Sequence, residues 1–187
     1  MQVEPIRKKS DVKKLLQHLE SHPRNNALFA VGINCGLRYS DLKRITVQDV
    51  KNVPVGQSFY TIETKTKKRR AVVINNVMRE AIDELLASKD YGPNDPIFQG
   101  SKKGYPLTWR SANELIKSWA RFLGLRGRYG THTLRKTFGY HQRKYGGVPI
   151  ELLQRVFNHK NIRETMLYIC IEDCEVDAIP MMHEIKY

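Results

Sequence analysis

The 187 residues carry 32 lysines and arginines against 19 aspartates and glutamates, a net charge of +13, and 41% of them are hydrophobic. This length and content suit one globular domain, and the charge favours a polyanionic partner such as nucleic acid over a merely basic soluble protein. Three cysteines do not make a disulfide framework, and no apolar run approaches the roughly 18 residues of a membrane helix. We therefore expect a cytoplasmic protein with reduced thiols and no membrane partner.

The first third of the chain predicts helices followed by a hairpin. Apolar residues at helical spacing predict one helix starting near Ser10, a second ending near Gly36, and a short third beginning at Ser40. Residues 59–62 and 71–74 are rich in β-forming residues. The basic segment between these two runs predicts the turn of an antiparallel hairpin.

Helical spacing returns in the rest of the chain. We expect helices in the following segments: 78–85, 112–123, 132–145, 149–157 and 161–170. Residues 93–104 predict a loop with a short strand at Ile97 and Phe98, and the glycines of 124–130 break the pattern. The predicted fold is a single domain over 1–187, mainly α with a small antiparallel β-sheet (α+β), ending in a tail over 172–187.

The charges are segregated along the chain. Between Glu114 and Glu151 there are eight basic residues and no acidic one, and five of the six residues 65–70 are basic. Such segregation predicts a DNA-facing side that follows the phosphate backbone. The expected DNA-contacting residues are Lys67, Lys68, Arg69, Arg70, Arg126, Arg128 and Lys136.

Three short motifs carry groups suited to phosphoryl transfer. Arg38 lies between two predicted helices, in a segment where a side chain can project into a groove, and Asp41 is placed to orient it or to cap the next helix. His132 and Arg135 share a helix face. His159 precedes a helix, and Tyr168 follows nine residues later. Taken singly, each motif is weak, since such residues more often serve as surface arginines, satisfied histidines or packing tyrosines.

In their order and spacing the motifs resemble those of the tyrosine recombinases, the phage integrase family. That family has Gly-Leu-Arg-x-Ser-Glu-Leu, a lysine in a hairpin turn, His-x-Leu-Arg-His, and Leu-Gly-His followed by a tyrosine. The corresponding residues here are Gly36-Leu37-Arg38-Tyr39-Ser40-Asp41-Leu42, Lys65, His132-Thr133-Leu134-Arg135-Lys136, Asn158-His159 and Tyr168. The resemblance covers about residues 8–175 and implies the tyrosine recombinase catalytic-domain fold.

The resemblance implies a role for each matched residue. Arg38 and Arg135 would clamp the scissile phosphate, and His132 would hydrogen-bond it and help move the proton of the nucleophile. Lys65, which precedes a small residue in the turn as the family lysine does, would be the general acid for the leaving 5′ hydroxyl. Tyr168 would form a 3′-phosphotyrosyl bond, without metal, ATP or any other cofactor.

The resemblance also implies a role for His159, and the chain departs from the family motifs at two positions. His159 would orient the phosphate and the tyrosine. Asn158 stands where the family prefers glycine, and Lys136 where a second histidine is common. Neither departure removes a catalytic group.

The resemblance also implies partners. Family members typically carry an N-terminal domain that closes around DNA; we expect a short form without it, which binds double-stranded DNA weakly, either alone or with an accessory DNA-binding protein as a partner. It would be a monomer in solution and a dimer or tetramer on DNA. The apolar residues of the tail, 172–187, would dock on a neighbouring subunit or pack on their own domain.

The predicted function is site-specific recombination by integration, excision or inversion of DNA. The main alternative is a DNA-binding regulator with the same fold that does not cut. A type IB topoisomerase should be larger and lack the Gly-Leu-Arg-x-Ser-Asp-Leu pattern, and a metal-dependent nuclease would need carboxylates clustered near the histidines.

Overall fold

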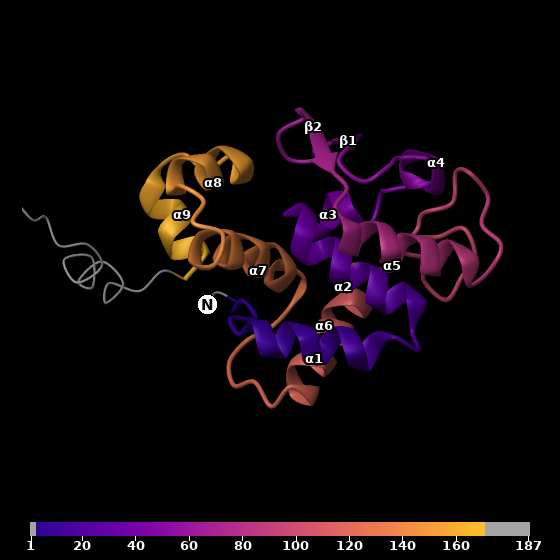
Figure 1. The fold of residues 1–187 in the computed structure, drawn as a ribbon, viewed down its shortest axis with the longest axis horizontal. Coiled ribbons are helices and arrows are strands. Elements are labelled where there is room, and N and C mark those ends of the chain that lie inside the picture. Colours follow the sequence, from indigo (N-terminus) through magenta and orange to yellow (C-terminus); the bar gives the residue numbers. More distant parts are fainter. Residues whose placement is uncertain (1–2, 171–187) are drawn as a thin grey trace, which may run out of the picture. The chain divides into compact units, whose positions relative to one another are not determined.

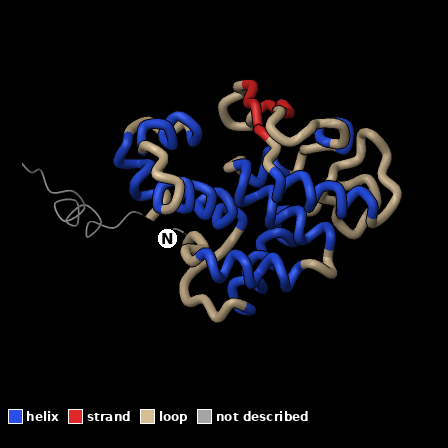
Figure 2. Tube along the Cα trace, viewed as in Figure 1, coloured by secondary structure: helices blue, strands red, loops and turns tan. Residues whose placement is uncertain are grey.

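The structure is a computed structural model that describes residues 3–170 (Figure 1). The helices are α1 (Lys9–Leu19), α2 (Pro23–Cys35), α3 (Tyr39–Leu42), α4 (Val47–Val50), α5 (Asn76–Ala87), α6 (Trp109–Phe122), α7 (Thr131–Lys144), α8 (Ile150–Phe157) and α9 (Ile162–Tyr168). The strands β1 (Ser58–Ile62) and β2 (Arg69–Val73) form one antiparallel hairpin (Figure 2). This confirms the predicted fold class.

The chain divides into two compact units. The N-terminal unit comprises residues 1–138 and the C-terminal unit residues 139–187, so the division falls inside α7. Each unit is described here by itself, and a single domain over 1–187 stays a prediction. The predicted tail, 172–187, lies outside the described residues.

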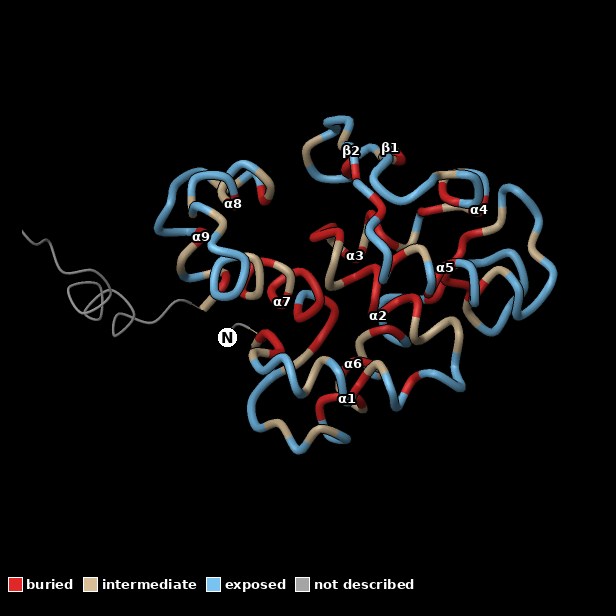
Figure 3. The backbone as a smooth tube through the Cα atoms, viewed as in Figure 1, coloured by how far each residue is buried: buried red, intermediate tan, exposed pale blue. Residues whose placement is uncertain are grey.

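Helix α2 is the centre of the N-terminal unit. Its residues Ala27 to Val31 are all fully buried, which Figure 3 shows as a continuous buried stretch of the trace. A helix that is apolar on every side needs neighbours on every side. α1 and α5 contact α2 directly, and from α6 the Trp119 ring meets the Phe29 ring edge-to-face at 5.8 Å.

Two glycines bring the end of α2 close to α7. A Cβ atom added to Gly32 would lie 2.6 Å from Leu134 Cδ1, and one added to Gly36 would lie 2.6 Å from Phe138 Cδ1. Gly36 also ends α2 in the left-handed region, at φ 60°, which glycine adopts without strain. These contacts set the distance between the segment that carries Arg38 and the helix that carries Arg135.

Gly32→Val is expected to destabilise the protein, because its branched side chain would overlap that of Leu134. Overpacking of this kind costs about 1–3 kcal/mol of unfolding free energy, measurable by urea denaturation. Gly92→Ala is the control, since its Cβ would meet Asp95 at an ordinary 3.6 Å. Equal stability of the two variants would contradict this close packing.

The hairpin register pairs Ser58 with Val73 and Ile62 with Arg69. Both strands therefore begin earlier than predicted, and the turn is residues 63–68. In this turn the backbone N–H of Glu63 donates to the Lys68 carbonyl, and the N–H of Lys67 donates to the Glu63 carbonyl. The turn is thus closed by its own backbone, with Lys65 exposed within it.

Two local predictions need correction, and one helix was missed. Helix α1 has Lys8 rather than Ser10 at its N-cap, and no side chain caps it. Residues 97–98 are buried but are not a strand; isolated bridges at Pro96 and Gln99 flank them. Helix α4 was not predicted, although the carboxylate of Asp49 accepts from both the backbone N–H and the hydroxyl of Thr46, a local start signal.

The described part of the C-terminal unit has a small core of its own. Leu153, Phe157 and Ile169 are almost fully buried, and a Cβ on Gly139 would lie 2.6 Å from both Phe157 and Ile169. The end of α7 thus packs closely on α8 and on the residue after α9. Within residues 3–170, no helix is both long enough and apolar enough to cross a membrane.

Candidate active site

Arg38 is held at the junction that the sequence predicts. It is the N-cap residue of α3, with extended backbone angles, and its neighbours Leu37 and Tyr39 are buried. The Tyr39 hydroxyl donates to the Leu107 carbonyl at 2.6 Å, which anchors the junction. The Arg38 side chain is 16% exposed.

Arg135 joins α7 to the same junction. Its Nη1 donates to the Gly36 carbonyl at 2.5 Å, and the residue is 2% exposed. Leu134 beside it is buried against Gly32. Two motifs almost a hundred residues apart in sequence therefore meet within the N-terminal unit.

His132 lies one helical turn before Arg135 and is electrostatically linked to both arginines. The residue as a whole is exposed. Partial loss of solvent around its ring, and then the positive charges of Arg135, Arg38 and Lys136, lower the pKa of His132 below its ordinary value. The lowered pKa favours the neutral imidazole, which is the form able to accept a proton.

A buried carboxylate that the sequence analysis did not single out lies beside Arg38. Glu63 is 4% exposed and pairs through Oε2 with Arg38 Nη1 at 3.4 Å and through Oε1 with Arg70 Nη1 at 3.2 Å. Burial alone would raise the pKa of Glu63, but the Thr66 hydroxyl and the two arginines lower it overall. In the sequence, Glu63 is the one acidic residue between residues 50 and 79, and this isolation is the feature by which it could have been singled out.

Asp41 binds the hairpin rather than capping α3. Its Oδ1 accepts from the Thr64 backbone N–H at 2.8 Å and from the Ser40 hydroxyl at 3.3 Å, and the residue is fully buried. The sequence predicts a helix cap or a partner for the Arg38 guanidinium at this position. Asp41 instead fixes the residue before Lys65 to α3.

The predicted DNA-contacting residues differ in their exposure. Arg70 is half-buried, pairs with Glu63 and donates to the Cys35 carbonyl at 2.9 Å, and Lys136 is buried at 2% exposure. Arg69 lies over the Tyr60 ring at 3.9 Å. The exposed members of the set are Lys67, Lys68, Arg69, Arg126 and Arg128.

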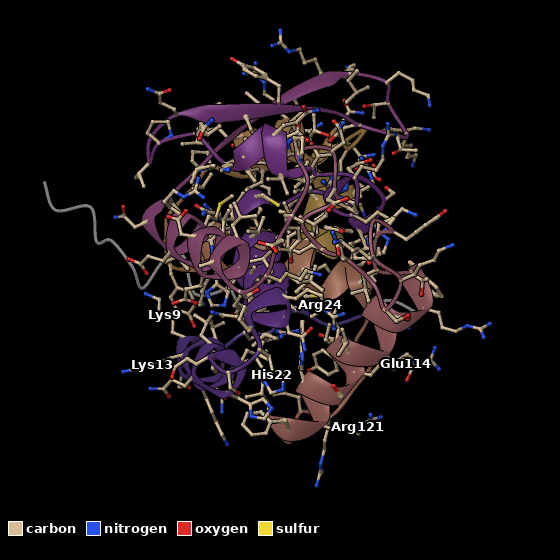
Figure 4. The ribbon with its side chains drawn as sticks, turned by 90° about the vertical axis from the view of Figure 1, so that its right-hand side faces the viewer. Lys9, Lys13, His22, Arg24, Glu114 and Arg121 are labelled. Atoms are coloured by element: carbon tan, nitrogen blue, oxygen red, sulfur yellow. The ribbon has the colours of Figure 1, made fainter. Side chains whose placement is uncertain are left out.

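Basic side chains also lie outside the predicted set. Figure 4 shows Lys9 and Lys13 projecting from α1, and Arg121 projecting from α6. Glu114 on α6 pairs with Lys117 at 2.8 Å, so this surface carries both signs of charge. The segregation of charge in the sequence is therefore less sharp on the surface of the N-terminal unit.

His159 and Tyr168 lie together in the C-terminal unit. Their rings meet edge-to-face at 4.9 Å, and His159 Nδ1 lies 3.0 Å from the hydroxyl of buried Thr165. Asn158 ends α8 in the left-handed region at φ 52°. Asparagine tolerates this conformation better than most residues, which explains how it can stand where the family prefers glycine.

The six predicted catalytic residues thus form two groups. Arg38, His132 and Arg135 are gathered in the N-terminal unit, where Lys65 lies in the adjoining hairpin turn, and His159 and Tyr168 are paired in the C-terminal unit. Among residues 3–170, no three His, Cys, Asp or Glu side chains are grouped as a metal site.

Comparison with known proteins places these motifs in a family. The model of the phage integrase family matches residues 7–174. The probable integrase/recombinase YoeC of Bacillus subtilis is 36% identical over 174 residues, which cover 91% of each chain. A tyrosine recombinase of Pseudothermotoga lettingae is 30% identical over 172 residues, which cover 91% of this chain and 58% of that protein.

Solved structures share the fold at lower identity. The crystal structure of XerA recombinase has a TM-score of 0.78 at 19% identity, covering all of this chain and 68% of the other. XerH bound to a palindromic difH substrate, a post-cleavage complex, has a TM-score of 0.72 at 20% identity, covering 95% and 54%. A lambda integrase dimer bound to a core site has a TM-score of 0.64 at 18% identity, covering 100% and 64%. Because the family model spans nearly the whole chain and the Bacillus protein matches over most of both lengths, this chain belongs to the phage integrase family of tyrosine recombinases.

Proposed function

We propose that this protein carries out site-specific DNA recombination, cutting and rejoining strands through a 3′-phosphotyrosyl bond at Tyr168. The observation that carries the proposal is the cluster of Arg38, His132 and Arg135, joined by the bond from Arg135 to the Gly36 carbonyl. Two fixed guanidinium groups suit the two non-bridging oxygens of a phosphate, because each planar fork can donate two parallel hydrogen bonds.

In the proposed reaction the Tyr168 oxygen attacks phosphorus and the bond from phosphorus to the 5′ oxygen breaks. Neutral His132 accepts the phenolic proton, directly or through water, and Lys65 donates a proton to the leaving 5′ oxygen. Arg38 and Arg135 offset the negative charge that develops on phosphate, and such fixed charges are usually the largest catalytic contribution. Attack by a 5′ hydroxyl on the phosphotyrosine reverses these steps and rejoins the strand.

The proposed partner is double-stranded DNA, contacted mainly through its phosphates by the exposed basic residues. Self-association on DNA, as a dimer or tetramer, is supported by the dimeric lambda integrase complex. A monomeric state in solution, an accessory DNA-binding protein and a cytoplasmic location are parts of the same proposal. Whether the reaction integrates, excises or inverts DNA depends on the arrangement of the sites.

The proposal is tested by covalent capture. A pool of nicked duplexes with randomised sequence is incubated with the full chain, and adducts that survive denaturation are amplified. Cleavage beside a nick releases a short fragment carrying the 5′ hydroxyl, so rejoining fails and the adduct accumulates. A regulator that binds without cutting would enrich sequences by affinity but yield no adduct.

Adduct formation is expected to be unchanged in EDTA and without ATP. The energy of the phosphodiester is kept in the phosphotyrosine, and arginines supply the positive charge that a metal would otherwise provide. The measurement is the rate of adduct formation on a captured duplex with EDTA or with magnesium. Activity that stops in EDTA and returns with magnesium would refute this mechanism.

A further inference from the structure

Glu63 has an arrangement of contacts that a packing residue would not need. Its Oε2 lies 2.7 Å from the Thr66 hydroxyl, which donates to it, and 3.4 Å from Arg38 Nη1. Its Oε1 pairs with Arg70. The side chain is 5% exposed, so these bonds lie largely out of water, where they are stronger.

The backbone of Glu63 belongs to the same turn as Lys65. The Glu63 N–H donates to the Lys68 carbonyl, and the Glu63 carbonyl accepts from the Lys67 N–H. On the other side of Lys65, Thr66 is bonded to the Glu63 side chain. Thr64, before Lys65, donates to Asp41 of α3. The exposed lysine is thus held at both flanks by buried carboxylates.

From these contacts we infer that Glu63 is a positioning residue that holds the phosphate-binding Arg38 and the turn of the general acid Lys65 in one rigid arrangement. This inference rests on the proposed function. The Thr66 bond is shorter than the Arg38 contact, so the larger effect of Glu63 falls on the lysine turn.

The inference predicts a defect that depends on the leaving group. Glu63→Gln should slow cleavage of a captured duplex by about 10²-fold, the scale of misplacing a catalytic group by about 1 Å. DNA affinity should not fall, since removing a negative charge does not weaken attraction to phosphate. A global structural fault would reduce both.

The decisive substrate replaces the bridging 5′ oxygen with sulfur. A thiolate leaves without needing a proton, because thiols have a pKa of about 8.5, so the contribution of Lys65 becomes unnecessary. On this duplex the Glu63→Gln defect should shrink at least about tenfold, since general acid catalysis is typically worth about 10²–10⁴. A remainder caused by Arg38 should persist. Equal defects on the oxygen and sulfur duplexes, or no defect on oxygen, would overturn the inference.

Further variants distinguish a failure of the inference about Glu63 from a failure of the proposed role of Lys65 and from misfolding. Glu80→Gln, at an exposed position of α5, is the control for charge. Lys65→Ala should be restored by sulfur more fully than Glu63→Gln; if it is not, the proposed role of Lys65 fails instead. Should Glu63→Gln not fold, Thr66→Val carries the test: it removes the 2.7 Å bond, and should show a smaller defect that sulfur also relieves. Thr66→Ser, which keeps the hydroxyl, should cleave both duplexes normally.

Discussion

Tyr168→Phe is expected to abolish the covalent protein–DNA adduct and to leave DNA binding nearly intact. The substitution removes only the hydroxyl, which is the proposed nucleophile, and a benzene ring can still pack on Phe157 and His159 at 5.3 Å and 4.9 Å. A tyrosine with a pKa of about 10 is a poor nucleophile at pH 7 without activation. Adduct on a captured nicked duplex is measured on a denaturing gel, and affinity by anisotropy.

The matched control is Tyr145→Phe, an exposed tyrosine of the same unit. It should form adduct at the normal rate. An adduct that persists in the Tyr168→Phe variant would show that another residue is the nucleophile. Loss of adduct in the control variant as well would point to a general fault in the C-terminal unit.

Arg38→Lys and Arg135→Lys are each expected to slow cleavage by about 10²–10³-fold, although the charge is kept. Losing one fixed donor to the transition state has this cost, and an ammonium cannot reproduce the planar fork. For Arg135 the substitution also changes the group that donates to the Gly36 carbonyl at 2.5 Å. The measurement is the single-turnover rate of adduct formation.

Arg44→Lys is the control, because Arg44 is exposed and follows α3. Because Arg135 is buried, thermal melting of each variant must accompany the kinetics. Cleavage near the normal rate by both arginine variants would refute the clamp. A large loss at Arg135 alone, with a lowered melting temperature, would mean that its role is to hold α7 to the end of α2.

Patterns among neighbouring residues of the sequence were enough to predict most helices and strands, and to place the candidate catalytic residues on them. Gly36 ends a helix, Arg38 stands before the next one, and His132 and Arg135 share a helix face, because capping and periodicity depend on near neighbours. Lys65 was placed in a turn for the same reason. The element missed outright, α4, is a single helical turn too short for periodicity to detect.

Which side chains and carbonyls these residues bind depends also on contacts between distant segments, and sequence periodicity does not reveal those contacts. Arg70 is drawn inward by the Cys35 carbonyl at the end of α2, and Asp41 binds Thr64 because the hairpin lies on α3. Lys136 reads as a surface cation in sequence but is buried on α7. Burying a charge requires compensating partners. For Glu63, Thr66 and Arg70 come from the same hairpin, but Arg38 is 25 residues away in sequence and reaches Glu63 only once the hairpin has packed on the segment that begins α3.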